Sequence, residues 1–238
     1  MGAGGVGCRR VSCDADLFWE DGLIAQELIE GLPASVSVIG SGQGARAVAV
    51  NEQLIGLPWA GARGFRYCGN ITPLEPACPG IAEMAEEIVA KLGLLGSNGV
   101  DFLLTDHGPV VVEVNARFQG SLDTVELATG INLFQAHINA FQGLLPERKL
   151  ALFTAGRALI YARRDLVVSE DLDREWTTDV PLPGSRIARD DPIISILAKG
   201  KSRDDVVAEL KHKSAMLTGD QRQKSKFPLD CSYQDTTL

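Results

Sequence analysis

Four polar residues near the middle of the chain have the types and the spacing of a metal-binding site. Glu113, Asn115 and Arg117 alternate along one apolar run, so their side chains project from the same face of a strand. Asp101 lies on the preceding apolar run, across a His-Gly-Pro turn, and can reach that face from the partner strand of a hairpin. Carboxylates held beside an amide favour a bound cation, and oxygen ligands so few in number suit Mg²⁺ shared with substrate phosphates. The Arg117 guanidinium adds a donor suited to a phosphate or a carboxylate.

The run from Asp101 to Arg117 resembles the metal-binding hairpin of the ATP-grasp superfamily, in which an acid is followed at a distance by Glu-x-Asn-x-Arg. The resemblance implies ATP as a cofactor with Mg²⁺ (or Mn²⁺), the ion being bound by Asp101, Glu113 and Asn115. It also implies that Asn115 and Arg117 act in catalysis. The alternative is an ordinary edge hairpin with a solvated polar face. Such a face would more naturally carry Lys and Thr than an acid, an amide and an Arg beside Val110–Val112.

The first residues of the chain are rich in glycine and formally match the pattern GxGxxG. A dinucleotide-binding loop requires a helix after this pattern, whereas a strand-like run follows here. ATP-grasp enzymes carry a Gly-rich flap over the nucleotide phosphates. By this resemblance Gly4, Gly5 and Gly7 are expected to bind the cofactor through their backbone N–H groups. A flexible N-terminal tail is the alternative interpretation.

A second nucleotide-binding element is expected between Ile24 and Gly31, which resembles the Gln/Glu-Glu-hydrophobic strand that lines the adenine pocket of ATP-grasp enzymes. The resemblance implies that the backbone of the middle of this run faces the adenine edge and that its last acid reaches the ribose. The implied cofactor-binding residues are Gln26, Glu27, Leu28, Ile29 and Glu30. An amphipathic strand with its acids in solvent is the alternative.

The composition excludes several classes of protein. The chain has 238 residues, enough for one large domain or two small ones, and its net charge of −8 argues against a nucleic-acid or anionic membrane surface. It contains neither an apolar run long enough to span a membrane nor an apolar signal-peptide core. Its five cysteines are odd in number and lack metal-site spacing, so reduced thiols in a cytoplasmic protein are expected.

Apolar periodicity and turn residues predict the order of the elements. Strands are expected at residues 9–13, 23–29, 35–39, 46–50, 155–162 and 193–198, in addition to the hairpin. Helices are expected at residues 80–93, at 122–143 with a break near Gly130, and from a capping box at Ser202 to Lys213.

The resemblance implies an α+β chain with the two-lobe ATP-grasp fold. Residues 1–50 are expected to form the first lobe, with the flap and an antiparallel sheet, and residues 51–148 the second lobe with the metal-binding hairpin. Residues 149–213 are expected to form a small C-terminal β/α element, and residues 214–238 a flexible tail. ATP-grasp enzymes also have an N-terminal α/β domain, which we expect either upstream of this chain or in a partner polypeptide.

The implied activity is that of an ATP- and Mg²⁺-dependent ligase that activates a carboxylate as an acyl phosphate for attack by an amine or a similar nucleophile. Its partners are then small-molecule substrates, and the protein acts as a homo-oligomer or with a partner that supplies the missing domain. Two alternatives stay open: a non-catalytic ATP-binding remnant or subunit, and a carboxylase-type enzyme that activates bicarbonate.

Several other polar residues fit either a functional or a structural role. Four side chains in the region 61–73 are expected either to face the acceptor substrate or to pack within a loop: Arg63, Arg66, Tyr67 and Asn70. His107 lies in the hairpin turn and is expected at the surface. His137 lies on the apolar face of a predicted helix and is expected to be a core residue with a hydrogen-bond partner.

Overall fold

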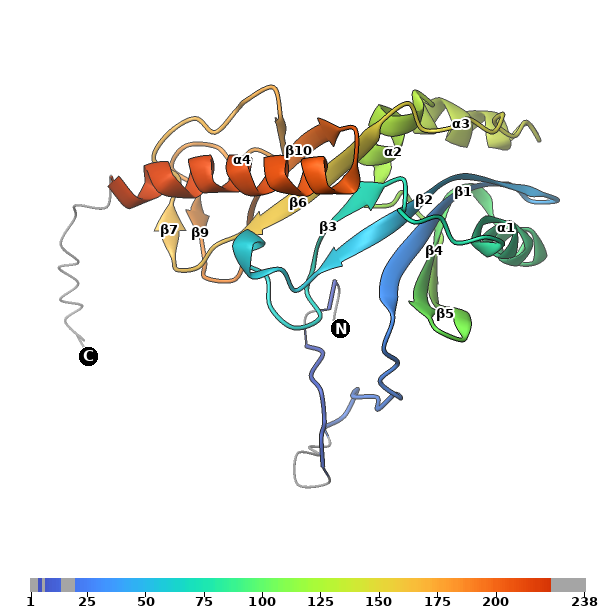
Figure 1. The fold of residues 1–238 in the computed structure, drawn as a ribbon, viewed down its shortest axis with the longest axis horizontal. Helices are drawn as coiled ribbons and strands as arrows, with labels where there is room; N and C mark the ends of the chain where they lie inside the picture. The colour runs from blue at the N-terminus through green and yellow to red at the C-terminus, as the bar shows by residue number, and fades with distance from the viewer. Residues whose placement is uncertain (1–3, 6, 14–19, 224–238) are drawn as a thin grey trace, which may run out of the picture.

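The computed structural model describes the backbone of residues 4–5, 7–13 and 20–223, with side chains of the last helix as far as Leu217. Its centre is a sheet in the strand order β5-β4-β1-β2-β3-β6-β10-β8, with antiparallel neighbours throughout (Figure 1). The strands of this sheet are β1 (Leu32–Ser41), β2 (Ala45–Ile55), β3 (Tyr67–Thr72), β4 (Leu95–Thr105), β5 (Gly108–Asn115), β6 (Thr154–Tyr161), β8 (Thr177–Thr178) and β10 (Pro192–Gly200). A separate ribbon pairs β7 (Leu166–Val167) with β9 (Arg186–Ile187).

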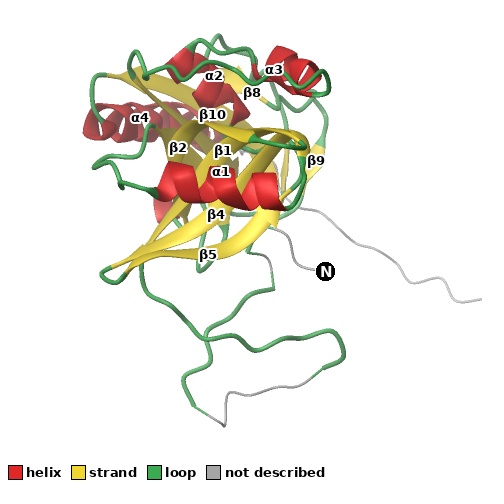
Figure 2. Ribbon diagram, turned by 90° about the vertical axis from the view of Figure 1, so that its right-hand side faces the viewer, coloured by secondary structure: helices red, strands yellow, loops and turns green. Residues whose placement is uncertain are grey.

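Helices cover both faces of the sheet because side chains of opposite character alternate along its strands. Ala34, Val36 and Val38 of β1 pack with α1 (Ile81–Lys91), and α4 (Arg203–Gln223) packs on the same face against β6 and β10. The other face carries α2 (Leu122–Thr129) and α3 (Leu133–Ala140), which lie together in Figure 2. No helix in the part of the chain that the structure describes combines the length and the apolarity needed to span a bilayer.

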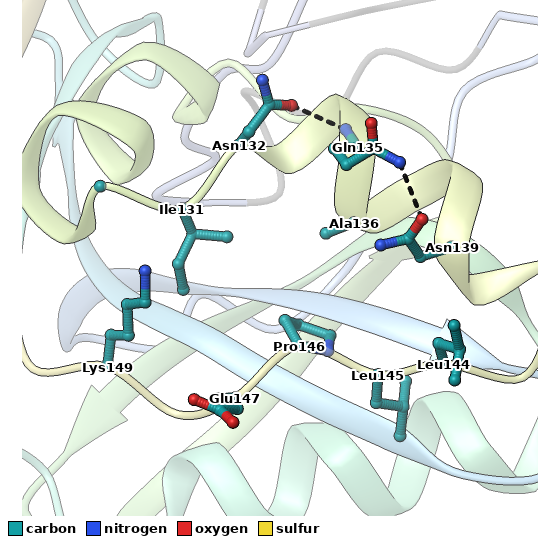
Figure 3. Close-up of a pocket in the computed structure, with 11 residues that line it drawn as sticks. Ile131, Asn132, Gln135, Ala136, Asn139, Leu144, Leu145, Pro146, Glu147 and Lys149 are labelled. Atoms are coloured by element: carbon teal, nitrogen blue, oxygen red, sulfur yellow. Dashed lines mark hydrogen bonds between the residues drawn. The ribbon is translucent and has the colours of Figure 1, made fainter.

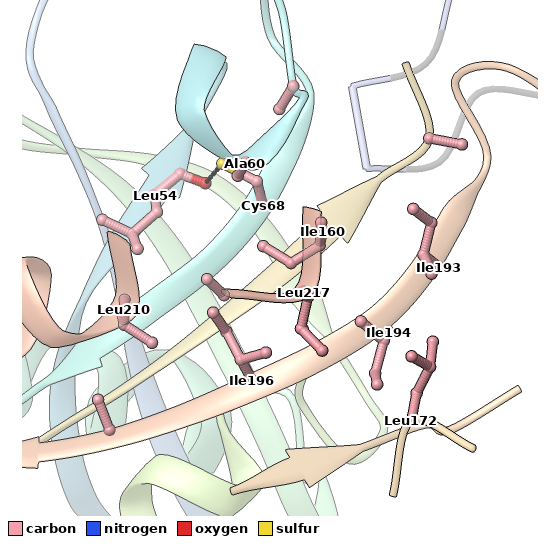
Figure 4. Packing of buried hydrophobic residues seen from close by; sticks show 14 of the residues in the cluster. Leu54, Ala60, Cys68, Ile160, Leu172, Ile193, Ile194, Ile196, Leu210 and Leu217 are labelled. Atoms are coloured by element: carbon pink, nitrogen blue, oxygen red, sulfur yellow. Dashed lines mark hydrogen bonds between the residues drawn. The ribbon is translucent and has the colours of Figure 1, made fainter. Parts of the chain in front are cut away.

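The largest hydrophobic cluster lies between the sheet and α4 (Figure 4). Its members include Leu54, Cys68, Ile160, Ile194, Ile196, Leu210 and Leu217. Each large aliphatic side chain buried in this way stabilises the fold by about 1.5–3 kcal/mol relative to an exposed one. This cluster therefore fixes β3, β6 and β10 side by side.

On the opposite face, a network of buried polar side chains attaches α2 to the strands. Its members are Ser35, Ser37, Asn51, Asn70, Thr72, Ser121 and Thr124, all at most 6% exposed. The Thr72 hydroxyl donates to Asn51 Oδ1 at 2.7 Å and lies 2.9 Å from Thr124 Oγ1. Because α2 begins shortly after Arg117, these bonds also hold the segment that leaves the hairpin.

Most of the predicted elements are confirmed, and the chain is α+β as expected. The strands at residues 35–39, 46–50, 155–162 and 193–198, the hairpin, the helix at 80–93 and the broken helix at 122–143 all form, with α2 ending before a left-handed Gly130. The strands expected at 35–39 and 46–50 belong to the same sheet as the hairpin.

The strands predicted at residues 9–13 and 23–29 are wrong. The described residues 7–13 and 20–31 contain no regular strand and are mostly exposed, while residues 14–19 lie outside the described part. An extended run becomes a strand only when it pairs with a neighbour. Both edges of β1 are already paired, with β2 and β4, which leaves no place beside it.

The last helix is longer than predicted, since α4 continues past Lys213 to Gln223. Leu210 and Leu217 lie two turns apart on one face, and both are buried against the sheet. The predicted flexible tail was therefore wrong for residues 214–223, and residues 224–238 lie outside the described part.

Candidate functional site

The hairpin of β4 and β5 brings the four residues of the predicted metal site into one hydrogen-bonded cluster. Asp101 and Glu113 pair directly across the hairpin. Asn115 Nδ2 donates to Asp101 Oδ2 at 3.2 Å and to Glu113 Oε1 at 2.9 Å. Arg117 Nη2 donates to Asn115 Oδ1 at 2.9 Å. A shift of register between Asp101 and Phe102 marks a bulge at this point, a device that often re-aims side chains next to functional sites.

The donor set of this cluster fits a divalent cation. The pKa of Asp101 is raised from 3.8 to about 6, chiefly by burial, with hydrogen bonding to Gln53 opposing the rise and the nearby Glu113 carboxylate contributing to it. Asn115 Nδ2 stands between the two carboxylates, in the position that a cation would take, and a turn of the amide places its oxygen there instead. In the described residues no group of three or more His, Cys, Asp or Glu has metal-binding geometry, so this set relies on its amide. Few protein ligands leave room for phosphate oxygens.

Metal binding at this cluster is expected to weaken in acid. Asp101 must lose its proton to bind a cation, so the affinity for Mn²⁺ should fall by about tenfold per pH unit below about pH 6. Without metal, the free energy of unfolding depends on pH in the opposite direction. A raised pKa of Asp101 stabilises the fold at low pH, and that contribution is lost as the pH rises through about 6. Titration calorimetry with Mn²⁺ between roughly pH 5 and pH 8 checks this. Asp101→Asn should abolish both dependences, and a constant wild-type affinity would contradict the assignment.

A second charged group, Arg157 on β6, lies on the same face of the sheet. Its strand pairs with β3, so that Arg157 stands directly beside Asn70. Burial raises the pKa of Tyr67, the nearby Arg157 guanidinium opposes the rise, and the Asp101 carboxylate adds to it. The pKa of the Tyr67 phenol therefore responds to both charges. Gly120 lies against this phenol, where an added Cβ would be 3.2 Å from the hydroxyl.

Sequence reasoning missed Arg157. The signal that could have found it is a single charged residue within the small and apolar strand 154–161. Lone charges in such strands are partnered or functional, because an unpaired buried charge is costly. Asn70, by contrast, is 1% exposed and its amide donates to Thr72 Oγ1 at 3.3 Å. Arg66 lies over the Tyr161 ring at 4.9 Å, so the packed alternative holds for Asn70 and Arg66.

The prediction that His107 lies at the surface is confirmed, and His137 has the predicted hydrogen-bond partner but is half-buried rather than in the core. His137 Nδ1 accepts from the backbone N–H of Ser97 at 2.9 Å, and its ring packs 4.8 Å from that of Phe118. His107 is exposed in the hairpin turn. Neither imidazole belongs to the hairpin cluster.

The glycines predicted to bind phosphates divide into two groups. The Gly4 carbonyl accepts from the Tyr67 N–H at 2.9 Å. Gly5 lies so close to the Phe65 carbonyl that a Cβ there would be 1.9 Å from its oxygen, which only glycine permits. Both therefore reach the end of β3 that carries Tyr67. Gly7 is exposed, with no atom within 4 Å of an added Cβ.

The predicted adenine-binding residues lie on the extended segment that leads into β1. Gln26, Glu27, Leu28 and Glu30 are exposed and Ile29 is half-buried. A pocket of about 290 Å³ between α3 and residues 144–149 (Figure 3) and another of about 370 Å³ between β2 and α4 contain none of them. The structure thus brings the four hairpin residues together and places Gly4 and Gly5 at the start of β3, while the predicted adenine-binding residues are mostly exposed.

The chain belongs to the ATP-grasp family, since the family model described as the ATP-grasp domain matches residues 1–121. A relative from Methanocaldococcus jannaschii, described as uncharacterized, is 28% identical over 178 residues, which are 74% of this chain and 42% of the relative. The 3-methyl-D-ornithine--L-lysine ligase of Methanosarcina acetivorans is 28% identical over 229 residues, which are 89% of this chain and 59% of the ligase.

Solved structures confirm the fold. The L-amino acid ligase from Bacillus licheniformis superposes with a TM-score of 0.63 at 18% identity, covering 78% of this chain and 50% of that one. Biotin carboxylase from Campylobacter jejuni gives a TM-score of 0.63 at 15% identity, and the match covers 77% of this chain and 45% of the carboxylase. The chain therefore has the ATP-grasp fold and spans about half the length of the proteins it matches.

Proposed function

We propose that this protein is an ATP- and Mg²⁺-dependent ligase that activates a small-molecule carboxylate as an acyl phosphate for attack by an amine. The observation that carries the proposal is the contact of Asp101, Glu113, Asn115 and Arg117 in one cluster on the hairpin. The names of two similar proteins, a 3-methyl-D-ornithine--L-lysine ligase and an L-amino acid ligase, support an amine as the nucleophile.

In this proposal the protein positions charges rather than forming covalent bonds. Asp101, Glu113 and Asn115 would hold the ion, which neutralises β- and γ-phosphate oxygens when bound. Arg117 donates to the phosphoryl group in transfer, and the backbone N–H groups of Gly4 and Gly5 contribute to phosphate binding together with Gly7. The residues Gln26, Glu27, Leu28, Ile29 and Glu30 would bind the adenosine part after closing over it.

The proposed reaction has two steps, formation of the acyl phosphate and its attack by the amine. A substrate carboxylate oxygen bonds to the γ-phosphorus as the bond to the bridging oxygen of ADP breaks. The amine nitrogen then bonds to the acyl carbon, the carbon–oxygen bond to phosphate breaks, and the amine proton passes to phosphate or water. Arg157, on the same face of the sheet as the hairpin cluster, is the candidate group for orienting the carboxylate.

Phosphate release tests the proposal directly. With ATP and Mg²⁺, we expect ADP and phosphate only when a carboxylate and an amine are both present, and screening pairs of amino acids and polyamines should identify them. Phosphate release with bicarbonate alone would instead favour a carboxylase, for which the likeness to biotin carboxylase is the specific observation. Stabilisation by ATP and Mg²⁺ without any turnover would indicate a non-catalytic nucleotide-binding subunit.

A cytoplasmic location and an assembly with a second copy or a partner polypeptide complete the proposal. Four cysteines form no disulfide within the described residues, which suits a reducing compartment: Cys8, Cys13, Cys68 and Cys78. The assembly stays a prediction, checked by the mass of the purified protein in solution.

A further inference from the structure

Arg157 is surrounded by more negative charge than it can neutralise. Its Nη1 donates to the Gly120 carbonyl at 3.1 Å and pairs with Asp123 Oδ2 at 3.1 Å. Its Nη2 donates to Ser195 Oγ at 2.9 Å and pairs with Asp179. The Arg157 side chain is only 18% exposed, so these contacts occupy most of its surface. One guanidinium thus faces two carboxylates, and a substrate anion could reach it only by replacing one of them.

Asp179 is the partner that is easiest to replace. Its side chain is 57% exposed, whereas that of Asp123, which is fixed within α2, is 30% exposed. Its backbone has φ +55, a left-handed conformation that side chains other than glycine adopt at a cost in free energy. It follows β8, which pairs with β10 over only two residues. The Asp179 carboxylate is therefore held against Arg157 by a short and strained connection.

An unpaired hydroxyl lies beside this ion pair. Thr178 Oγ1 is buried and has no hydrogen-bond partner among the residues that the structure describes. Thr178 pairs directly with Ser195 across β8 and β10, so the two side chains lie on the same face of the sheet and close together. Ser195 is 0% exposed and accepts from Arg157. A buried donor without an acceptor is unfavourable, and an incoming oxyanion would supply that acceptor.

We propose that Arg157, Ser195 and Thr178 form an oxyanion subsite, and that the Asp179 carboxylate occupies it until a ligand displaces it. Asp179 thereby determines specificity, because only an anion that binds Arg157 better than this tethered carboxylate is admitted. The identity of the natural anion, a substrate carboxylate, rests on the proposed function. The subsite itself rests on the contacts around Arg157.

Phosphate binding tests the subsite without ATP or metal. Purified full-length protein is titrated with inorganic phosphate in EDTA, and the affinity is read from the rise in melting temperature. Asp179→Asn and Asp179→Gly both suit a left-handed backbone, so both variants should fold. Each should bind phosphate about fivefold more tightly than wild type, a factor that corresponds to about 1 kcal/mol for an exposed ion pair.

The hydroxyl is tested in the Asp179→Asn background. Adding Thr178→Val should weaken phosphate binding about fivefold while raising the melting temperature without phosphate, because an unpaired buried hydroxyl is removed. The matched control is Asp190→Asn, which changes another exposed aspartate with a left-handed backbone (φ +69) that pairs with Arg189 instead. This control should leave phosphate affinity unchanged.

Phosphate affinity in both Asp179 variants no higher than in wild type overturns the proposal, as does an equal gain in the Asp190 control. Failure of the subsite and failure of the proposed ligase function give different results. If the variants respond as expected and no ligase activity is found, the subsite is supported and the proposed ligase function is rejected. If activity is found but Asp179→Asn leaves the KM for the carboxylate unchanged, the ligase function is supported and the proposal that Asp179 occupies the carboxylate subsite is rejected.

Discussion

Replacing Glu113 by Gln is expected to lower the affinity for Mg²⁺ and ATP together by about 100-fold while leaving the fold intact. Gln has the same size, and its oxygen can still accept from Asn115 Nδ2, which donates to Glu113 Oε1 at 2.9 Å. The residue is exposed, so the change in the free energy of unfolding should stay within about 0.5 kcal/mol. What is lost is one of two negative charges facing the cation. Titration calorimetry with ATP at fixed Mg²⁺ measures the effect.

The matched control is Asp106→Asn, which removes the same charge from an exposed acid in the turn of the same hairpin. Because screening weakens interactions between exposed charges, this variant should bind ATP and Mg²⁺ within about twofold of wild type. Equal affinity in wild type and Glu113→Gln would show that the hairpin cluster does not bind the ion. Equal losses in both variants would mean that only the net charge of the hairpin matters.

The cluster on the hairpin could be predicted from the sequence because its geometry is local. The period of two places Glu113 and Asn115 on one face of β5, and both strands are joined by a short turn. Asp101 comes opposite Glu113 only through the bulge between Asp101 and Phe102, because the register set by the turn would place Val112 there. The elements with strong periodicity, such as α1 with its buried Ile81, Ala85 and Val89, were predicted for the same reason.

Arg157 could not be placed from the sequence, because its position depends on a pairing between distant strands. Residues 69–72 of β3 pair with residues 155–158 of β6, and nothing in either run specifies the other. The strand predicted at 23–29 failed for the complementary reason, since its apolar residues are present but the segment pairs with no strand in the described part of the chain. Local pattern shows what a segment can form, and tertiary pairing decides whether it does so.

The pairing of β3 with β6 should fail when Gly69 is replaced by Ala, with a loss of about 3 kcal/mol or more in the free energy of unfolding. Gly69 has φ +135, and a Cβ there would lie 2.0 Å from the Arg157 carbonyl oxygen and 2.9 Å from the Cα of Ala158. Both obstacles are backbone atoms, which cannot rotate away. These strands share only four residue pairs, Gly69 to Thr72 with Ala158 to Ala155, so moving one pair weakens the whole connection.

The same pairing joins the two halves of the candidate site, since it connects the part of the sheet that carries the hairpin to the strand that carries Arg157. Urea unfolding measures the loss, and Gly64→Ala is the control. Gly64 also has a left-handed backbone (φ +56), but no atom of the described residues lies within 4 Å of its added Cβ, so only the conformational cost of about 1 kcal/mol is expected. If Gly69→Ala loses no more than Gly64→Ala, β3 and β6 are not as close as described. The link from the metal-binding hairpin to Arg157 would then be lost with them.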